Sequence, residues 1–205
     1  MTAYRNHSGN HSPGDGAAAQ PVRFARRAAA DLAQRLRRVV QGELLFDAAS
    51  RGRYSTDASI YQVEPLGVLV PLTEDDVRAA LAVCRELHVP VLPRGAGSSQ
   101  CGQAVGRALV IDYTKHLDEI IAFDADHRTI VVQPGLVLDR LNDWLKRYGL
   151  WFPVDVSTSA QATLGGMAGN NSCGSRSIAY GNMVHNVLGI EAVLADGTDV
   201  SFGPL

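Results

Sequence analysis

The most informative run of the chain is Pro93-Arg94-Gly95-Ala96-Gly97-Ser98-Ser99-Gln100-Cys101-Gly102. Glycine permits positive φ angles, so successive backbone N–H groups can converge on one point, and the missing side chains let an anion approach the backbone closely. Such a nest of donors binds phosphate oxygens, and Ser98 and Ser99 add hydroxyl donors. Arg94 can either supply charge or tie the loop down. The run favours a phosphate-binding loop, with a glycine turn that holds no ligand as the alternative.

The spacing of the glycines separates this run from two common phosphate loops. A Rossmann fingerprint requires G-x-G-x-x-G, but position 100 is Gln. Gly97 and Gly102 satisfy G-x-x-x-x-G, but Gln103 and Ala104 follow where a P-loop requires Lys and then Ser or Thr. The sequence therefore predicts neither a Rossmann cofactor site nor a nucleoside triphosphatase.

A second glycine-rich run, Thr163-Leu164-Gly165-Gly166-Met167-Ala168-Gly169-Asn170-Asn171-Ser172-Cys173-Gly174, follows about 70 residues later. It predicts a helix start that another molecule can approach closely, because its glycines leave the backbone uncovered. Asparagine offers both donors and acceptors, which suits an amide-rich heterocycle. We interpret Cys173 as a small residue without special reactivity.

The two runs are embedded in alternating strand and helix patterns. A strand predicted over Gly67–Pro71, a helix capped by Thr73 and a strand over Val89–Pro93 make a parallel pair with a right-handed crossover. The helix buries a stripe that includes Cys84. Downstream, the pattern predicts strands at 108–113, 119–123, 129–133, 187–194 and 200–202 and a helix at 137–148. The fold class expected is α+β, with a small parallel or mixed βαβ lobe and a larger, mostly antiparallel sheet lobe flanked by helices.

Composition limits the domain organisation. We expect a disordered tail at 1–22, an N-terminal helix (Arg23–Val40) and lead-in at 23–64, and the folded domain at 65–205. The 19 basic and 21 acidic residues give a net charge of -2, which argues against a nucleic-acid partner. Three cysteines without a C-x-x-C pair argue against a disulfide framework and favour the cytoplasm. No run is apolar enough to span a membrane, although the Arg-rich helix leaves peripheral membrane association open.

In combination, these runs resemble the FAD-binding domain, of PCMH type, of the vanillyl-alcohol oxidase / p-cresol methylhydroxylase flavoprotein family. The likeness covers about 140 residues and includes Pro65-Leu66-Gly67-Val68, Phe152-Pro153-Val154-Asp155 and the segment from Ala179-Tyr180-Gly181 to Gly197, besides the two glycine-rich runs. It is strongest to the D-2-hydroxy-acid dehydrogenase branch, which includes the glycolate oxidase flavin subunit. Some long bacterial members of this branch fuse the flavin half to an iron–sulfur half.

The resemblance implies bound FAD, with its diphosphate on Gly95–Ser99, its flavin ring near Gly165–Asn170 and its adenine side near Gly189–Ile190. Val154 and Val156 stand where many relatives carry proline, so the ring-side loop departs from the family pattern. Relatives with covalent flavin place a histidine in the first loop, where this chain has Ser98 and Ser99, so dissociable FAD is expected. The expected cofactor-binding residues are Pro93, Arg94, Gly95, Ala96, Gly97, Ser98, Ser99, Gly102, Pro153, Asp155, Thr163, Leu164, Gly165, Gly166, Gly169, Asn170, Asn171, Gly174, Gly189 and Ile190.

The implied reaction transfers a hydride from the α-carbon of a D-2-hydroxy acid, of the lactate, glycolate or 2-hydroxyglutarate type, to flavin N5. The substrate-binding cation and the base are expected beyond Leu205, so the sequence identifies no catalytic residue, no metal site and no electron acceptor. An iron–sulfur cluster is expected only in a downstream region, and this chain alone is expected to be inactive. Two alternatives stay open: a non-catalytic FAD-binding or electron-transfer subunit, and an NADPH-dependent flavin reductase of the same fold.

Overall fold

The computed structural model describes residues 19–203, with side chains from residue 28 onward. Its first lobe is built on a four-stranded sheet in the order β1-β2-β4-β3. The strands are β1 (Glu43–Leu45), β2 (Gly67–Val70), β3 (Val91–Arg94) and β4 (Leu109–Asp112). β2 and β3 run parallel to each other, but the predicted direct pairing between them is wrong, because β4 lies between them and pairs in parallel with both. β1 adds an antiparallel edge. Every residue of β2 and β4 is buried, as continuous apolar strands in the middle of a parallel sheet are.

Helix α3 (Glu74–Glu86) covers this sheet as the crossover between β2 and β3. Thr73 caps it by accepting a hydrogen bond from the Asp76 N–H at 3.4 Å. Its buried stripe includes Ala80 and Cys84, which pack with Leu69 of β2 and Leu109 of β4. The prediction that Cys84 is a core residue is therefore confirmed.

The segment predicted as a lead-in contributes to the same lobe. The helix expected over Arg23–Val40 is observed as α1 (Ala19–Leu36), and it packs its Leu32 and Leu36 into the core beside α3. A turn follows Leu36, and the Gln41 N–H then donates to the Asp76 carboxylate at 2.6 Å, which directs the chain into β1. The short helix α2 (Ala48–Arg53) leads back to β2. The sheet thus extends upstream of Pro65, while most of the predicted tail lies outside the described residues.

The second lobe combines an antiparallel ribbon with short helices. The ribbon is β5 (Ile120–Asp124) with β6 (Thr129–Val132). Helix α4 (Leu138–Leu145), which continues as the 3-10 turn η1 (Lys146–Tyr148), packs against it, and Gly149 ends the turn at a φ of 67°. The helices α5 (Leu164–Gly169), α6 (Ser177–Tyr180) and α7 (Met183–Asn186) complete the lobe. Its separate core contains Leu138 and Leu141 of α4, Val154, and Met167 of α5.

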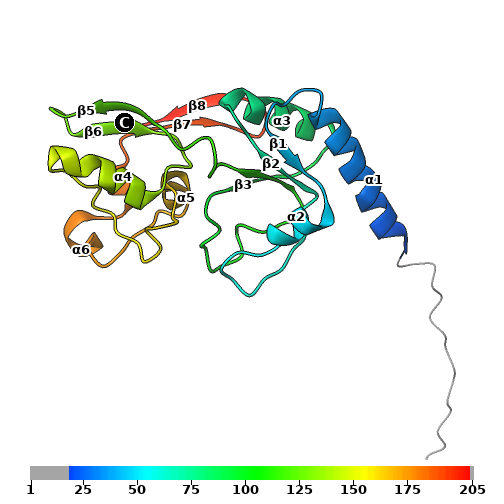
Figure 1. Ribbon diagram of the computed structural model, residues 1–205, viewed down its shortest axis with the longest axis horizontal. Helices are drawn as coiled ribbons and strands as arrows, with labels where there is room; N and C mark the ends of the chain where they lie inside the picture. The colour runs from blue at the N-terminus through cyan, green and yellow to red at the C-terminus, as the bar shows by residue number, and fades with distance from the viewer. Residues whose placement is uncertain (1–18, 204–205) are drawn as a thin grey trace, which may run out of the picture.

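A second antiparallel ribbon, β7 (Ile190–Val193) with β8 (Asp199–Phe202), lies between the β5–β6 ribbon and α3 (Figure 1). Arg78 of α3 forms an ion pair with Asp199 at 2.6 Å, and Arg85 donates to the carbonyl oxygen of Asp196. The α+β class with two lobes is confirmed. The antiparallel strands form two separate ribbons. Within residues 19–203, no helix has both the length and the apolar character needed to cross a membrane.

Candidate cofactor-binding site

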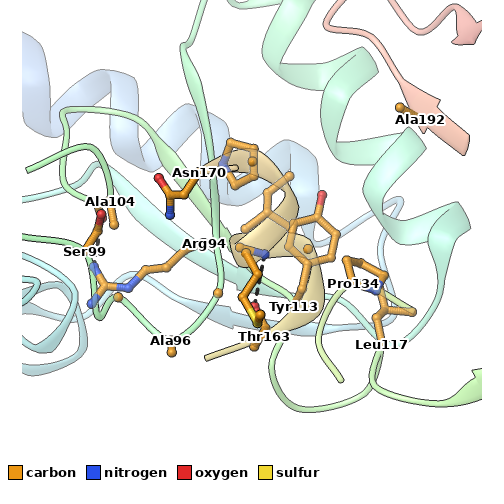
Figure 2. Close-up of a pocket in the computed structure, with 18 of the residues that line it drawn as sticks. Arg94, Ala96, Ser99, Ala104, Tyr113, Leu117, Pro134, Thr163, Asn170 and Ala192 are labelled. Atoms are coloured by element: carbon orange, nitrogen blue, oxygen red, sulfur yellow. Dashed lines mark hydrogen bonds between the residues drawn. The ribbon is translucent and has the colours of Figure 1, made fainter. Parts of the chain in front are cut away.

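A cavity of about 930 Å³ lies between the two lobes, which is within the size range of small-molecule and cofactor sites. Its walls come from the loop after β3, the loop before α4, helix α5, helix α3 and strand β7. Figure 2 shows Arg94, Ala96 and Ser99 on one side of this cavity, and Leu117 and Pro134 on the other. Residues from both lobes are therefore needed to form the cavity.

The sheet delivers the first glycine-rich run to the cavity. Arg94 and Asp112 are paired at the carboxyl ends of the parallel strands β3 and β4, so the residues that follow both strands emerge at one edge. The Arg94 guanidinium donates to the carbonyl oxygens of Ala104 at 2.9 Å and Thr56 at 2.8 Å. Of the two roles considered for Arg94, these bonds favour the one in which its guanidinium ties the loop down over the one in which it supplies charge. Gly97 has a φ of +66°, and a Cβ there would lie 2.5 Å from the guanidinium, so the bend over Arg94 requires glycine.

A buried hydrogen-bond pair supports the start of this loop. The Tyr54 hydroxyl donates to the Asp112 carboxylate at 2.5 Å, and Thr114 donates to the same carboxylate from its N–H and its hydroxyl at 2.9 and 2.7 Å. Burial, together with this hydrogen bond to Asp112, raises the pKa of Tyr54 well above its usual range. The phenol is therefore neutral and remains a donor at physiological pH.

The second glycine-rich run begins helix α5, as its sequence predicts. The Thr163 hydroxyl accepts from the Gly166 N–H at 3.3 Å and caps the helix. The N–H groups of Gly165 and Leu164 donate to the carbonyl oxygens of Pro134 and Leu136, both at 2.9 Å. A Cβ at Gly165 would lie 2.6 Å from the Pro134 side chain, so glycine allows this close approach.

The two runs meet across the cavity. A Cβ on Gly95 would overlap the Thr163 hydroxyl oxygen, so glycine lets the first loop pack directly against the cap of α5. Further along, the Gln103 amide donates to the Asn170 side-chain oxygen at 2.8 Å. All four residues line the cavity. Two stretches about 70 residues apart in sequence therefore form one site, and they do not lie on opposite faces of the molecule.

The expected cofactor-binding residues divide into two groups. Those that line the cavity are Pro93, Arg94, Gly95, Ala96, Gly97, Ser98, Ser99, Thr163, Gly165, Gly166, Gly169 and Asn170. Those that do not line it are Gly102, Pro153, Asp155, Leu164, Asn171, Gly174, Gly189 and Ile190. Contact with FAD stays a prediction for every one of these residues.

Several members of the second group shape the loops around the site. Asp155 accepts from the Ser175 hydroxyl at 2.7 Å and the Arg176 N–H at 3.0 Å, and the hydrogen bond from Ser175 lowers its pKa. A Cβ on Gly174 would overlap the Asp155 backbone, so this glycine lets the two loops pack together. The Asn171 side chain accepts from the Val184 N–H at 3.0 Å and so anchors α7.

Two other residues of the second group, Leu164 and Gly102, pack against neighbouring side chains outside the cavity. The Leu164 side chain is buried in the core of the second lobe. Gly102 has a φ of +77°, and a Cβ there would lie 2.5 Å from the Tyr61 ring. Both residues support the site without reaching the cavity.

The cavity also contains residues that the sequence interpretation missed. They include Val77, Arg78 and Leu81 of α3, Tyr113 after β4, Leu117, Pro134, and Glu191, Ala192 and Val193 of β7. Tyr113 directly follows β4, at the same sheet edge where β3 ends with Arg94. The parallel pairing of β3 and β4 was therefore the signal that could have identified it. Burial raises the pKa of Tyr113 to about 12, which keeps its phenol neutral. The β7 residues come directly after Gly189 and Ile190, the pair expected at the adenine side.

The arrangement suits an elongated ligand with an anionic group. One part of the wall presents backbone and hydroxyl groups of the first loop together with the amides of Gln103 and Asn170. The rest combines apolar side chains, such as those of Leu117 and Val193, with the charged Arg78 and Glu191. Among residues 19–203, no cluster of three or more His, Cys, Asp or Glu side chains is arranged to hold a metal ion.

Comparison with known proteins identifies similar chains. A family model described as an FAD binding domain matches residues 65–203. D-2-hydroxyglutarate dehydrogenase of Pantoea ananatis is 35% identical over 80% of this chain and 16% of that protein. The glycolate oxidase subunit GlcD of Bacillus subtilis is 36% identical over 80% of this chain and 36% of that subunit.

A solved structure of p-cresol methylhydroxylase with substrate bound superimposes with a TM-score of 0.73 at 22% identity, over 85% of this chain and 35% of that chain. This likeness concerns the fold. The chain spans well under half of the length of each of these three proteins.

Proposed function

This chain belongs to the FAD-binding-domain family, and on that premise we propose that it is the flavin-binding part of an oxidoreductase acting on D-2-hydroxy acids. The resemblance to the D-2-hydroxy-acid dehydrogenase branch is confirmed by the relatives found. The observation that carries the proposal is the placement of both glycine-rich runs on one cavity between the lobes.

The residues present fit an FAD molecule held without a covalent bond. The backbone and the serine hydroxyls of Gly95–Ser99 would hold the diphosphate, because glycines leave their N–H groups accessible to phosphate oxygens. The start of α5 would lie beside the flavin ring, where Gly166 and Gly169 present no side chain and Asn170 offers an amide. When bound, the flavin supplies the capacity to accept a hydride. The protein part positions this cofactor at the junction of the lobes.

The substrate class is supported by the names of the relatives. D-2-hydroxyglutarate and glycolate are both 2-hydroxy acids, and the two relatives named for them match the chain over the same share of its length. We propose hydride transfer from such an acid for a polypeptide of the relatives' length. An iron–sulfur cluster, location in the cytoplasm and peripheral membrane association stay predictions of the sequence.

The binding proposal is tested by titrating the 205-residue chain with FAD and following the quenching of flavin fluorescence. We expect stoichiometric binding, and release of all the flavin when the protein is precipitated with acid, because no covalent bond holds it. Absence of binding at micromolar FAD would contradict the proposal. Flavin that stays with the precipitated protein would contradict the non-covalent attachment.

The substrate proposal requires the product of the complete coding frame. Under anaerobic conditions, D-2-hydroxyglutarate, D-lactate or glycolate is expected to bleach the flavin absorbance, whereas the L-enantiomers of the first two are not. Bleaching by NADPH alone would favour the flavin-reductase alternative. Bound flavin that none of these compounds reduces would favour the non-catalytic subunit.

A further inference from the structure

We propose that residues 54–62, a segment that we call the strap, position one donor of the first glycine-rich run, the Ser98 N–H, toward a bound phosphate. The strap lies upstream of residues 65–203, which the family model matches. The structure describes all of its residues, and none of them lines the cavity. The inference rests on the proposed FAD-binding function and adds a positioning element to it.

The strap is hydrogen-bonded to the first glycine-rich run at two places. Figure 1 shows it after α2, beside the loop that follows β3. The Arg94 guanidinium donates to the Thr56 carbonyl oxygen at 2.8 Å. Further along, the Ala58 N–H donates to the Gly97 carbonyl oxygen at 3.0 Å. The strap therefore supports the loop both at its start and at its bend.

The strap is itself fixed in shape, which a supporting element requires. The Tyr54 hydroxyl anchors its first residue to the Asp112 carboxylate at 2.5 Å. The Val63 N–H, directly after the strap, donates to the Ser55 carbonyl oxygen at 2.8 Å, so the two ends of the segment are joined. The direction in which the strap presents its own N–H groups is therefore set before a ligand binds.

The bond from Ala58 decides which way one peptide group of the loop faces. The peptide between Gly97 and Ser98 is trans, and in a planar trans peptide the C=O and the N–H point in opposite directions. Because the Gly97 carbonyl faces the strap, the Ser98 N–H faces away from it. Both residues line the cavity, which the strap does not reach, so this N–H lies on the cavity side of the loop.

A donor held in this direction suits a phosphate oxygen. Among the described residues, the Ser98 N–H donates to no backbone carbonyl and to no side chain, so it is available to a ligand. Glycine permits many backbone conformations, so without the bond from Ala58 the peptide after Gly97 would be free to turn. The strap removes this freedom before the ligand arrives, and preorganisation of this kind strengthens binding.

The test compares FAD affinity, measured by fluorescence titration, between the 205-residue chain and its variants. Ala58→Pro removes the N–H that donates to Gly97. We expect it to weaken FAD binding about tenfold, which corresponds to the loss of one hydrogen bond to a charged group. Ala58→Gly keeps the N–H and is expected to restore the affinity to within about threefold of the parent.

The matched control is Ala125→Pro, because Ala125 is also an exposed alanine but lies in the turn between β5 and β6 and does not line the cavity. Its FAD affinity should equal that of the parent. Unchanged FAD affinity in a folded Ala58→Pro variant would overturn the proposal, and so would an equal loss in the Ala125→Pro control. A parent chain that binds no FAD would contradict the proposed function itself.

An NMR measurement separates positioning of the donor from a purely structural role of the strap. In the 15N-labelled parent chain, the Ser98 amide proton resonance is expected to move downfield when FAD binds, because the proton would then face a phosphate oxygen. In Ala58→Pro saturated with FAD, the movement should be smaller. Equal movement in both chains would overturn the proposal, since the strap would then only stabilise the fold. If Ala58→Pro does not fold, the parent chain decides, because a Ser98 resonance that FAD leaves in place would overturn the proposal as well.

Discussion

Gly95 of the first glycine-rich run packs directly against Thr163 of the second. A Cβ there would overlap the Thr163 hydroxyl oxygen, which caps α5, so the first loop and the helix would have to separate. We expect Gly95→Ala to lower FAD affinity at least tenfold, measured by fluorescence titration, because the loop would no longer reach its position. Gly52→Ala is the control, since nothing lies within 4 Å of the added Cβ on helix α2 and FAD affinity should not change. Equal affinity of the two variants would contradict this account.

Cys84 differs from the other two cysteines in both exposure and ionisation. It is buried on α3, and burial raises the pKa of its thiol to about 11, whereas Cys101 and Cys173 are exposed. Because only the thiolate is nucleophilic, we expect iodoacetamide at pH 8 to modify Cys101 and Cys173 in the folded chain and Cys84 only after unfolding in urea. Peptide mass spectrometry reads the three sites separately. Modification of Cys84 in the folded chain at the rate of Cys101 would contradict the burial.

Single residues also show what the sequence could predict of the site. The glycines could be identified because their spacing along the chain is itself the signal. The part played by Arg94 could not be decided, because its partner Thr56 is distant in sequence and its partner Ala104 is reached only by the bend of the loop itself. Tyr113 was missed because nothing in its own neighbourhood in the sequence indicates a cavity; only the parallel pairing of β3 and β4 does so.

Among the elements, the N-terminus of α3 depends on a buried carboxylate. The side chain of Asp76 accepts from the N–H groups of Gln41 at 2.6 Å and Leu72 at 2.9 Å, so it joins the segment before β1 to the helix. Asp76→Ala should destabilise the fold by roughly 2–4 kcal/mol, measured by urea unfolding, because two N–H groups would lose their acceptor in a buried position. Asp75→Ala, in the same helical turn but exposed, is the control and should cost well under 1 kcal/mol. Similar losses of unfolding free energy in both variants would contradict this, because the stability would then depend on negative charge at the helix end and not on the buried hydrogen bonds of Asp76.

The pattern of elements shows the same division between local and distant information. The strand–helix–strand unit around α3 could be predicted because apolar strands, a capping threonine and a helical stripe are all local signals. The edge strand β1 could not, because three residues carry little periodicity and its pairing with β2 is distant in sequence. For the same reason, the predicted strands did not reveal that β5–β6 and β7–β8 would form separate ribbons.

At the scale of the whole molecule, the hydrophobic core is divided. One cluster of buried residues belongs to the second lobe, and two others lie around the sheet and α3 of the first lobe. The cavity lies between these cores, and the hydrogen bond between Gln103 and Asn170 joins its walls. A ligand that contacts both walls would therefore link two units that otherwise have separate cores.

This division predicts that FAD changes the cooperativity of unfolding. Both tryptophans, Trp144 and Trp151, belong to the second lobe, whereas the long helices α1 and α3 belong to the first and dominate the far-UV ellipticity. Without FAD, we expect the tryptophan emission maximum and the ellipticity to change at different urea concentrations, because the tryptophans report on the second lobe and the ellipticity mainly on the first. With FAD at about 100 times its dissociation constant, both transitions should move to higher urea and coincide, since binding adds about 2.7 kcal/mol to the state that has both walls in place. FMN, which lacks the adenine ring, is the control ligand and should produce a smaller shift than FAD. Coinciding transitions in the FAD-free chain would contradict the prediction, because the lobes would then already unfold as one unit.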